Sequence, residues 1–128
     1  MRSSHSKCVI IIGTIDTKGD EVLYLRKQLH ALGLTTTIID VGIGSVPSFD
    51  ADIGRDQVAS KTAANISSML NQENGKLKAM EAMAQGAFVL TEKKITAGKA
   101  QGIIAVGGGV GTWIGMQIMS RLAFGFPK

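Results

Sequence analysis

The sequence predicts an α/β protein, a Rossmann-like doubly wound parallel sheet with helices on both faces, in three layers. Short apolar runs rich in β-branched residues occupy residues 8–13, 35–41 and 102–106, and they lack the polar alternation of a half-exposed strand. Helical periodicity fills the stretches between these runs. Because 128 residues suit one domain, we treat residues 1–128 as a single α/β unit with one core.

The first third of the chain predicts a strand, helix and strand. Residues 8–13 end at a glycine, as a strand buried on both faces often does. Residues 20–32 carry apolar side chains at helical spacing, and Gly33 follows at the position of a C-terminal cap. Residues 35–41 then form a second strand, which a right-handed crossover places beside the first and parallel to it.

The connection to the third strand is longer. Residues 42–53 are rich in Gly, Ser, Pro and Asp, which predicts a loop at the carboxyl edge of the sheet. Residues 55–98 predict an insertion of two helices, one over 55–70 and one over 76–95. Asn74-Gly75 separates the two.

The last third predicts a strand over residues 102–106, a glycine loop over 107–111 and a helix over 112–122. The chain then winds back across the first strand, so the expected strand order is 2-1-3. Gly125-Phe126-Pro127-Lys128 is typical of the approach to another parallel strand. We therefore expect an incomplete sheet, three strands plus the start of a fourth, in a fragment of a larger protein or in a chain whose partner covers the edge.

Composition narrows the ligand class. Fourteen Lys and Arg against ten Asp and Glu give a net charge of +4, which favours anionic ligands. The cations are scattered, Arg26-Lys27 and Lys93-Lys94 being the only adjacent pairs, and few aromatic residues accompany them, which argues against nucleic acid. One cysteine, Cys8, permits no internal disulfide. His5 and His30 have no second ligand at metal-binding spacing, so we expect no metal site of protein ligands.

We also expect a cytoplasmic protein without a membrane segment. The apolar run before Gly13 is too short for the core of a signal peptide. Residues 100–120 carry no charge and are long enough to span a bilayer, but the three glycines 107–109 in their middle make a continuous membrane helix improbable.

Two unusual turns are expected to meet where the strand order reverses. Residues 13–19 follow the first strand and residues 107–112 follow the third, and ligands of such sheets bind at this point. A glycine-rich turn lets backbone N–H groups approach an anion, and the helix that follows adds its positive N-terminal end. The turn is neither a P-loop, since it has no Lys, nor a complete GxGxxG motif. Its glycines alternatively serve only a tight turn and close helix packing.

Individual polar residues at this edge leave alternatives open. Lys18 is a candidate phosphate ligand or a solvated loop lysine. Asp16 is a candidate for magnesium or a hydroxyl, or a turn cap. Asp40 stands where nucleotide folds hold a ribose, or it fixes its own loop. Trp113 is a candidate for base stacking, for the core or for an interface.

Five segments stand in the order seen in the Tm-one-like ATP-binding domain family, whose bacterial members are the uncharacterised family UPF0261. They are Gly13-Thr-Ile-Asp-Thr-Lys-Gly-Asp-Glu21, Asp40-Val-Gly42, Asp52-Ile-Gly-Arg55, Met80-Glu-Ala-Met-Ala-Gln-Gly-Ala87 and Gly107-Gly-Gly-Val-Gly-Thr112. The resemblance covers nearly the whole chain. It implies a two-domain protein roughly three times this length, of which this chain is similar to the amino-terminal, ATP-binding portion.

The resemblance also implies a ligand, ATP with or without magnesium, and a set of contact residues. Carried over by position, the set is Gly13, Thr14, Asp16, Thr17, Lys18, Asp40, Gly42, Gly107, Gly108, Gly109, Gly111 and Thr112. The glycine turn departs from the Gly-Gly-Ser-Gly-Gly-Thr pattern of the family at Gly109 and Val110, which removes one hydroxyl.

Three functional hypotheses follow. The first is a nucleotide-binding domain with phosphate at the glycine turn. The second is half of an enzyme cleft for a small carboxylate or phosphorylated metabolite, whose reacting groups the sequence does not reveal. The third is an interaction module that self-associates, for example as a dimer, through its sheet edge and binds no ligand.

Overall fold

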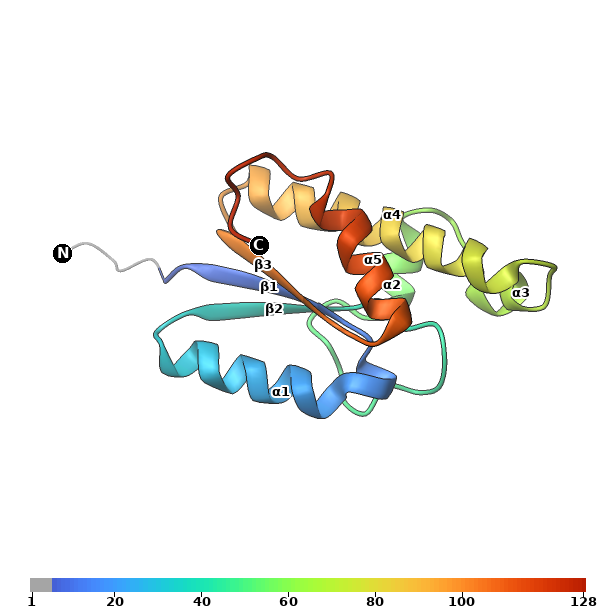
Figure 1. Ribbon diagram of the computed structural model, residues 1–128, viewed down its shortest axis with the longest axis horizontal. Helices are drawn as coiled ribbons and strands as arrows, with labels where there is room; N and C mark the ends of the chain where they lie inside the picture. The colour runs from blue at the N-terminus through green and yellow to red at the C-terminus, as the bar shows by residue number, and fades with distance from the viewer. Residues whose placement is uncertain (1–5) are drawn as a thin grey trace.

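The computed structural model describes residues 6–128, so His5 lies outside the described residues. This part of the chain forms three strands and five helices (Figure 1). In chain order they are β1 (Cys8–Gly13), α1 (Ile15–Ala31), β2 (Thr35–Asp40), α2 (Arg55–Ser60), α3 (Ile66–Leu70), α4 (Gly75–Thr96), β3 (Gly102–Val106) and α5 (Gly109–Met119).

The strands form an open parallel sheet in the order β2-β1-β3, which confirms the predicted 2-1-3 order. Gly13, the last residue of β1, is in register with Asp40 at the end of β2 and with Val106 at the end of β3. All three strands therefore end at the same edge of the sheet. The loops that leave them start side by side.

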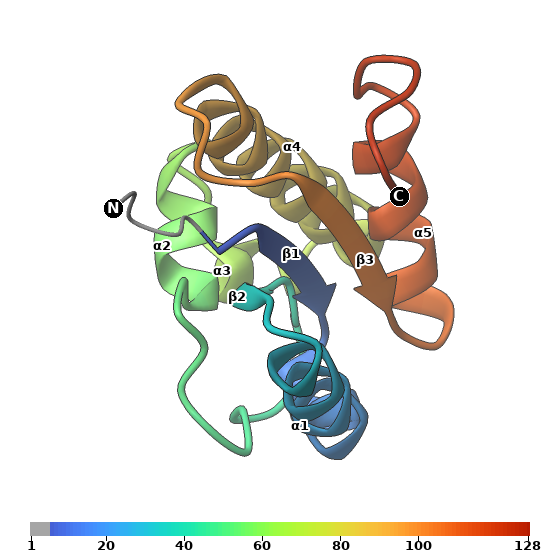
Figure 2. The same cartoon turned by 90° about the vertical axis from the view of Figure 1, so that its left-hand side faces the viewer.

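Helices cover both faces of the sheet, as a doubly wound fold requires (Figure 2). On one face Ile11 and Ile38 pack with Val22 and Leu29 of α1. On the other face a larger cluster joins β1 to α2, α4 and α5; it includes Ile10, Ile12, Val58, Met83, Ala87, Ile114 and Ile118. Successive isoleucines of β1 thus enter opposite layers, which explains why this strand has no polar alternation.

The helix after β1 begins earlier than the sequence predicts. A loop is expected over residues 13–19, but α1 already starts at Ile15, with Thr14 in extended conformation before it. A kink at Lys18, whose φ is −123° and ψ 24°, sets the first turn apart from the rest of the helix. The backbone N–H of Ile15 donates to the carboxylate of Asp40 over 3.3 Å, a contact from β2 that no local pattern contains.

The insertion also differs from the prediction, because residues 55–70 form two short helices rather than one. Ala63 adopts a φ of 54°, a left-handed conformation that ends helical geometry between α2 and α3. Asn65 then caps α3 by accepting a hydrogen bond from the Ser68 N–H over 2.9 Å. The connection from β2 to β3 therefore carries three helices where two are expected.

The glycine loop after β3 is shorter than predicted. It is expected over residues 107–111, but α5 starts at Gly109, so that only Gly107 and Gly108 lie between strand and helix. Trp113 is partly buried and packs against the core on the α5 side of the sheet.

Both outer edges of the sheet have neighbours. Beyond β2, Ile53 forms a parallel bridge with Ile39, and the Asp52 carboxylate accepts a hydrogen bond from the Ile38 N–H over 2.7 Å. Beyond β3, the Ile103 N–H donates to the carbonyl of Pro127 over 3.0 Å. The final residues of the chain therefore run beside β3. Of the helices in residues 6–128, none combines the length and apolar character that crossing a bilayer requires.

Candidate functional site

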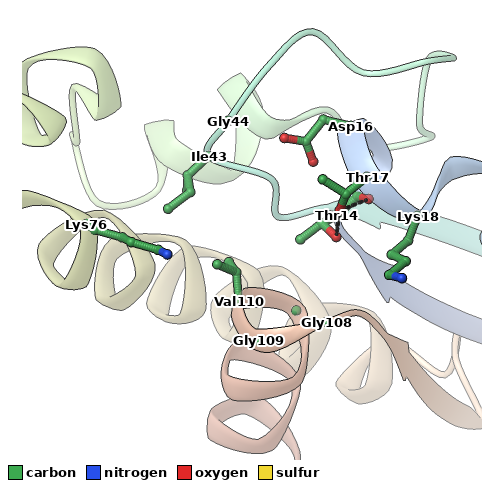
Figure 3. Close-up of a pocket in the computed structure, with 11 residues that line it drawn as sticks. Thr14, Asp16, Thr17, Lys18, Ile43, Gly44, Lys76, Gly108, Gly109 and Val110 are labelled. Atoms are coloured by element: carbon green, nitrogen blue, oxygen red, sulfur yellow. Dashed lines mark hydrogen bonds between the residues drawn. The ribbon is translucent and has the colours of Figure 1, made fainter.

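A pocket of about 400 Å³ lies at the edge where the strands end. Four segments line it: the first turn of α1, the loop after β2, the first turn of α4 and the start of α5 (Figure 3). The two turns that the sequence places at the switch point therefore do meet at one pocket. Its lining residues are Thr14, Asp16, Thr17, Lys18, Ile43, Gly44, Lys76, Gly108, Gly109, Val110 and Gly111.

Packing explains some of the glycines around β3 but not all. A Cβ on Gly107 would lie 2.5 Å from the Cα of Gly111, and a Cβ on Gly111 would lie 3.0 Å from the Val106 carbonyl oxygen. These two residues must be small for α5 to turn back onto its strand. A Cβ on Gly108 or Gly109 would meet no protein atom within 4 Å. Both of these residues line the pocket, so the space that their missing side chains leave is open to a ligand.

The start of α5 presents unsatisfied backbone donors to this pocket. Gly108 occupies the cap position and provides no side-chain acceptor. The first N–H groups of a helix have no acceptor within it, and the helix dipole makes this end positive. The Thr112 hydroxyl donates to the Gly107 carbonyl over 3.1 Å and holds the turn in place, outside the pocket lining.

The first turn of α1 faces the α5 turn across the pocket (Figure 3). The hydroxyls of Thr14 and Thr17 are hydrogen bonded to each other over 2.8 Å. Lys18 lies at the kink of α1, half-buried, and its side chain lines the pocket. Asp16 also lines it, although only 5% of its side chain is exposed.

Asp40 lies outside the pocket lining and binds the protein instead. Its side chain is 2% exposed, and Oδ1 accepts hydrogen bonds from the N–H groups of Ile15, at 3.3 Å, and Gly42, at 2.8 Å. Its Oδ2 accepts from Nε of Arg55 over 3.1 Å. These bonds correspond to the loop-fixing alternative of the sequence analysis.

Arg55 is a positioning residue that the sequence reasoning missed. Its Nη1 donates to the carbonyls of Gly44 and Ser45, at 3.2 and 2.8 Å, and its Nη2 lies 3.8 Å from Oδ1 of Asp16. One guanidinium thus ties the loop after β2 to β2 itself and to α1. Gly42 leaves room for it, because a Cβ there would lie 2.5 Å from Nη2.

Three further residues line the pocket that no pattern in the sequence predicts as site residues: Lys76, Ile43 and Gly44. Lys76 stands in the first turn of α4, and Figure 3 shows its side chain reaching over the pocket toward Val110. A surface lysine on a helix has no distinguishing pattern. Only the topology indicates that this part of the chain contributes to the site, because the connection from β2 to β3 must pass the switch point.

The sequence matches a known protein family over nearly its whole length. Residues 7–128 match the model described as the N-terminal domain of the uncharacterised protein family UPF0261. The chain belongs to UPF0261. UPF0261 proteins of Clostridium tetani, Brucella suis and Rhizobium meliloti are 32%, 30% and 33% identical to it over 96%, 98% and 95% of its length. The chain spans about 30% of the length of each of these relatives.

The UPF0261 domain has a donor set that suits an anion better than a metal ion. Within residues 6–128, no three His, Cys, Asp or Glu side chains gather where they could hold a metal. Among the described lining residues Asp16 is the one carboxylate, and it shares Arg55 as an ion-pair partner with Asp40. Magnesium needs near-octahedral oxygen ligands, so most of them would have to come from water and from a ligand's own phosphates.

The predicted site residues of the UPF0261 chain therefore fall into two groups. Seven line the pocket: Thr14, Asp16, Thr17, Lys18, Gly108, Gly109 and Gly111. Five lie behind the lining: Gly13, Asp40, Gly42, Gly107 and Thr112. Those of the second group support the pocket through close packing or through hydrogen bonds to its loops.

Proposed function

We propose that this chain binds a nucleotide, ATP being the leading candidate, with its phosphates at the N-terminus of α5. The observation that carries the proposal is the open space beside Gly108 and Gly109. No neighbouring atom requires a glycine at either position, and both face a pocket at a helix N-terminus. Backbone N–H groups that can be approached this closely are typical phosphate ligands.

The charges around the pocket support an anionic ligand. Lys18 and Lys76 approach it from different elements, and α1 and α5 both begin at its rim. Ile43 and Val110 add apolar surface, which suits the non-phosphate part of a nucleotide. The resemblance to the Tm-one-like ATP-binding domain family favours ATP among the possible phosphate compounds.

Titration calorimetry on the 128-residue chain tests the proposal. We expect saturable binding of ATP at one site, both with magnesium and in EDTA, because the protein's own contribution comes from backbone donors and lysines. Adenosine, which lacks phosphate, serves as the matched control and should bind at least about tenfold more weakly. Absence of ATP binding by the folded chain, or equal binding of adenosine, would contradict the proposal.

A further inference from the structure

The carboxylate of Asp16 is buried without a hydrogen-bond donor. Its side chain is 5% exposed, and Oδ1 is inaccessible to solvent and has no hydrogen-bond partner. Buried carboxylates normally accept several hydrogen bonds, because removal from water is costly for a charged group. Oδ1 itself is closed to a ligand, but Asp16 lines the pocket, so a bound molecule can donate a hydrogen bond to its other oxygen, Oδ2.

Arg55 is shared by Asp16 and Asp40, so one positive charge faces two carboxylates, and it does not supply Asp16 with a hydrogen bond. The closest atoms of Arg55 and Asp16, Nη2 and Oδ1, are 3.8 Å apart, and Nη2 also lacks a hydrogen-bond partner. The other nitrogens of Arg55 are bound to Asp40 and to the loop after β2, so the guanidinium cannot move toward Asp16 without losing these bonds. The protein therefore provides Asp16 with an ion pair but with no hydrogen-bond donor.

Gly44 keeps space beside this carboxylate. A Cβ at Gly44 would lie 2.6 Å from Oδ2 of Asp16, too close for any side chain. Gly44 itself lines the pocket. The second carboxylate oxygen is thus adjacent to the pocket and not covered by a side chain of the loop.

The two ends of the pocket differ in charge. Figure 3 shows Asp16 and Gly44 on one side and Gly108, Gly109 and Val110 on the other, with Thr14 and Thr17 between them. Phosphate oxygens are attracted to the start of α5 and repelled by Asp16. A ligand that fills the pocket must therefore present an anion at one end and a hydrogen-bond donor at the other.

We propose that Asp16 accepts a hydrogen bond from a hydroxyl of the ligand, so that the site selects phosphate esters of a sugar over bare polyphosphate. For ATP the donor is a ribose hydroxyl. This inference rests on the proposed function, because it assumes that the phosphates lie at α5. It assigns Asp16 to ligand selection rather than to magnesium.

Two ligands and one substitution test the role of Asp16 by calorimetry in EDTA and, in parallel, with magnesium. The ligands are ATP and inorganic tripolyphosphate, and the substitution is Asp16→Asn, which keeps the shape of the side chain and removes its charge. We expect Asp16→Asn to weaken the binding of ATP about tenfold, because a hydroxyl donates a weaker hydrogen bond to a neutral amide oxygen than to a carboxylate. Tripolyphosphate should bind the variant as tightly as the wild type or more tightly, because a repulsive charge is gone.

A modified ligand removes the hydroxyls instead of the carboxylate. 2′,3′-Dideoxy-ATP should bind the wild type about tenfold more weakly than ATP, whereas the difference between the two nucleotides should be clearly smaller for Asp16→Asn. Asp20→Asn, an exposed position on the same helix, is the matched control and should behave as the wild type. If Asp16→Asn does not fold, the wild-type comparison of ATP with its dideoxy form still decides the question.

Each contrary outcome has a distinct meaning. Equal affinity of the wild type for ATP and dideoxy-ATP, or an equal loss of ATP and tripolyphosphate in Asp16→Asn, overturns the role of Asp16. An effect of Asp16→Asn that appears only with magnesium overturns it in favour of metal binding. Failure of the wild type to bind either ATP or tripolyphosphate refutes the proposed function itself.

Discussion

Among the residues of the glycine turn, neighbouring atoms separate those required by packing from those that admit a ligand. Gly107 and Gly109 stand two positions apart, yet a Cβ on Gly107 would lie 2.5 Å from Gly111 and a Cβ on Gly109 would meet nothing within 4 Å. The sequence has glycine at both positions. Only the structure distinguishes them, because the deciding contacts depend on how α5 folds back onto β3.

Substitution of these two glycines by alanine should have opposite effects. Gly109→Ala should leave the free energy of unfolding unchanged or raise it by up to about 1 kcal/mol, because alanine is the better helix former. The same substitution should also weaken the binding of ATP about tenfold, because the methyl group enters the space in which we propose that phosphate binds. Gly107→Ala should lower the free energy of unfolding by about 1 to 3 kcal/mol through overpacking. Urea denaturation and calorimetry measure both quantities, and a Gly109→Ala variant with wild-type affinity would contradict the assignment.

Lys76 gives a second prediction for a single residue. If its ammonium group contacts phosphate, Lys76→Met should weaken ATP by about 1 to 3 kcal/mol and reduce the salt dependence of binding. Lys78→Met is the matched control, since Lys78 is exposed on the same helix and outside the pocket lining. Calorimetry at two salt concentrations makes the comparison. Equal affinities for the two variants would remove Lys76 from the site.

Among the elements, α5 forms the end of the pocket at which we propose that an anion binds, and its contact with β3 fixes its place. The contact is tight at Gly115, where a Cβ would lie 2.5 Å from the Cβ of Ala105. Gly115→Ala should therefore push α5 away from the sheet and lower the free energy of unfolding by about 1 to 3 kcal/mol. The binding of ATP should weaken as well, because the N-terminus of α5 shifts with the helix.

Ala105→Gly should rescue that variant, because it removes the methyl group with which the new side chain collides. Alone, Ala105→Gly should cost about 1 kcal/mol, the usual price of glycine in a strand. In a double-mutant cycle measured by urea denaturation, the two substitutions should show a favourable coupling of at least about 1 kcal/mol. Strict additivity would show that the helix does not depend on this contact.

Helix boundaries show where sequence reasoning succeeds and where it stops. The strands and α4 are predictable because their signals, β-branched runs and helical periodicity, are local. The early start of α1 is not, because it depends on the Asp40 carboxylate, which reaches Ile15 from another strand. Neither is the break at Ala63, since alanine favours helix and its left-handed conformation has no local cause in the sequence.

On the scale of the whole molecule, the pocket joins parts of the chain that are distant in sequence. The meeting of residues 13–19 with residues 107–112 is predictable because parallel strands in the order 2-1-3 end at one edge. The contributions of Lys76 and Gly44 are not, because they depend on how the loop after β2 and the start of α4 return to that edge.

Because the ligand would connect α1, α4, α5 and the loop after β2, it should stabilise the fold as a unit. ATP at about 100 times its Kd should add about 2.7 kcal/mol to the free energy of unfolding, which raises Tm by about 10 °C in a chain of this size. Differential scanning fluorimetry over a series of ATP concentrations measures the shift. Adenosine at the same concentration should give at most about half of this shift, and Gly109→Ala should need about tenfold more ATP for the same shift. An ATP-dependent shift of equal size in the wild type and Gly109→Ala would place the nucleotide away from α5, even if calorimetry shows that ATP binds.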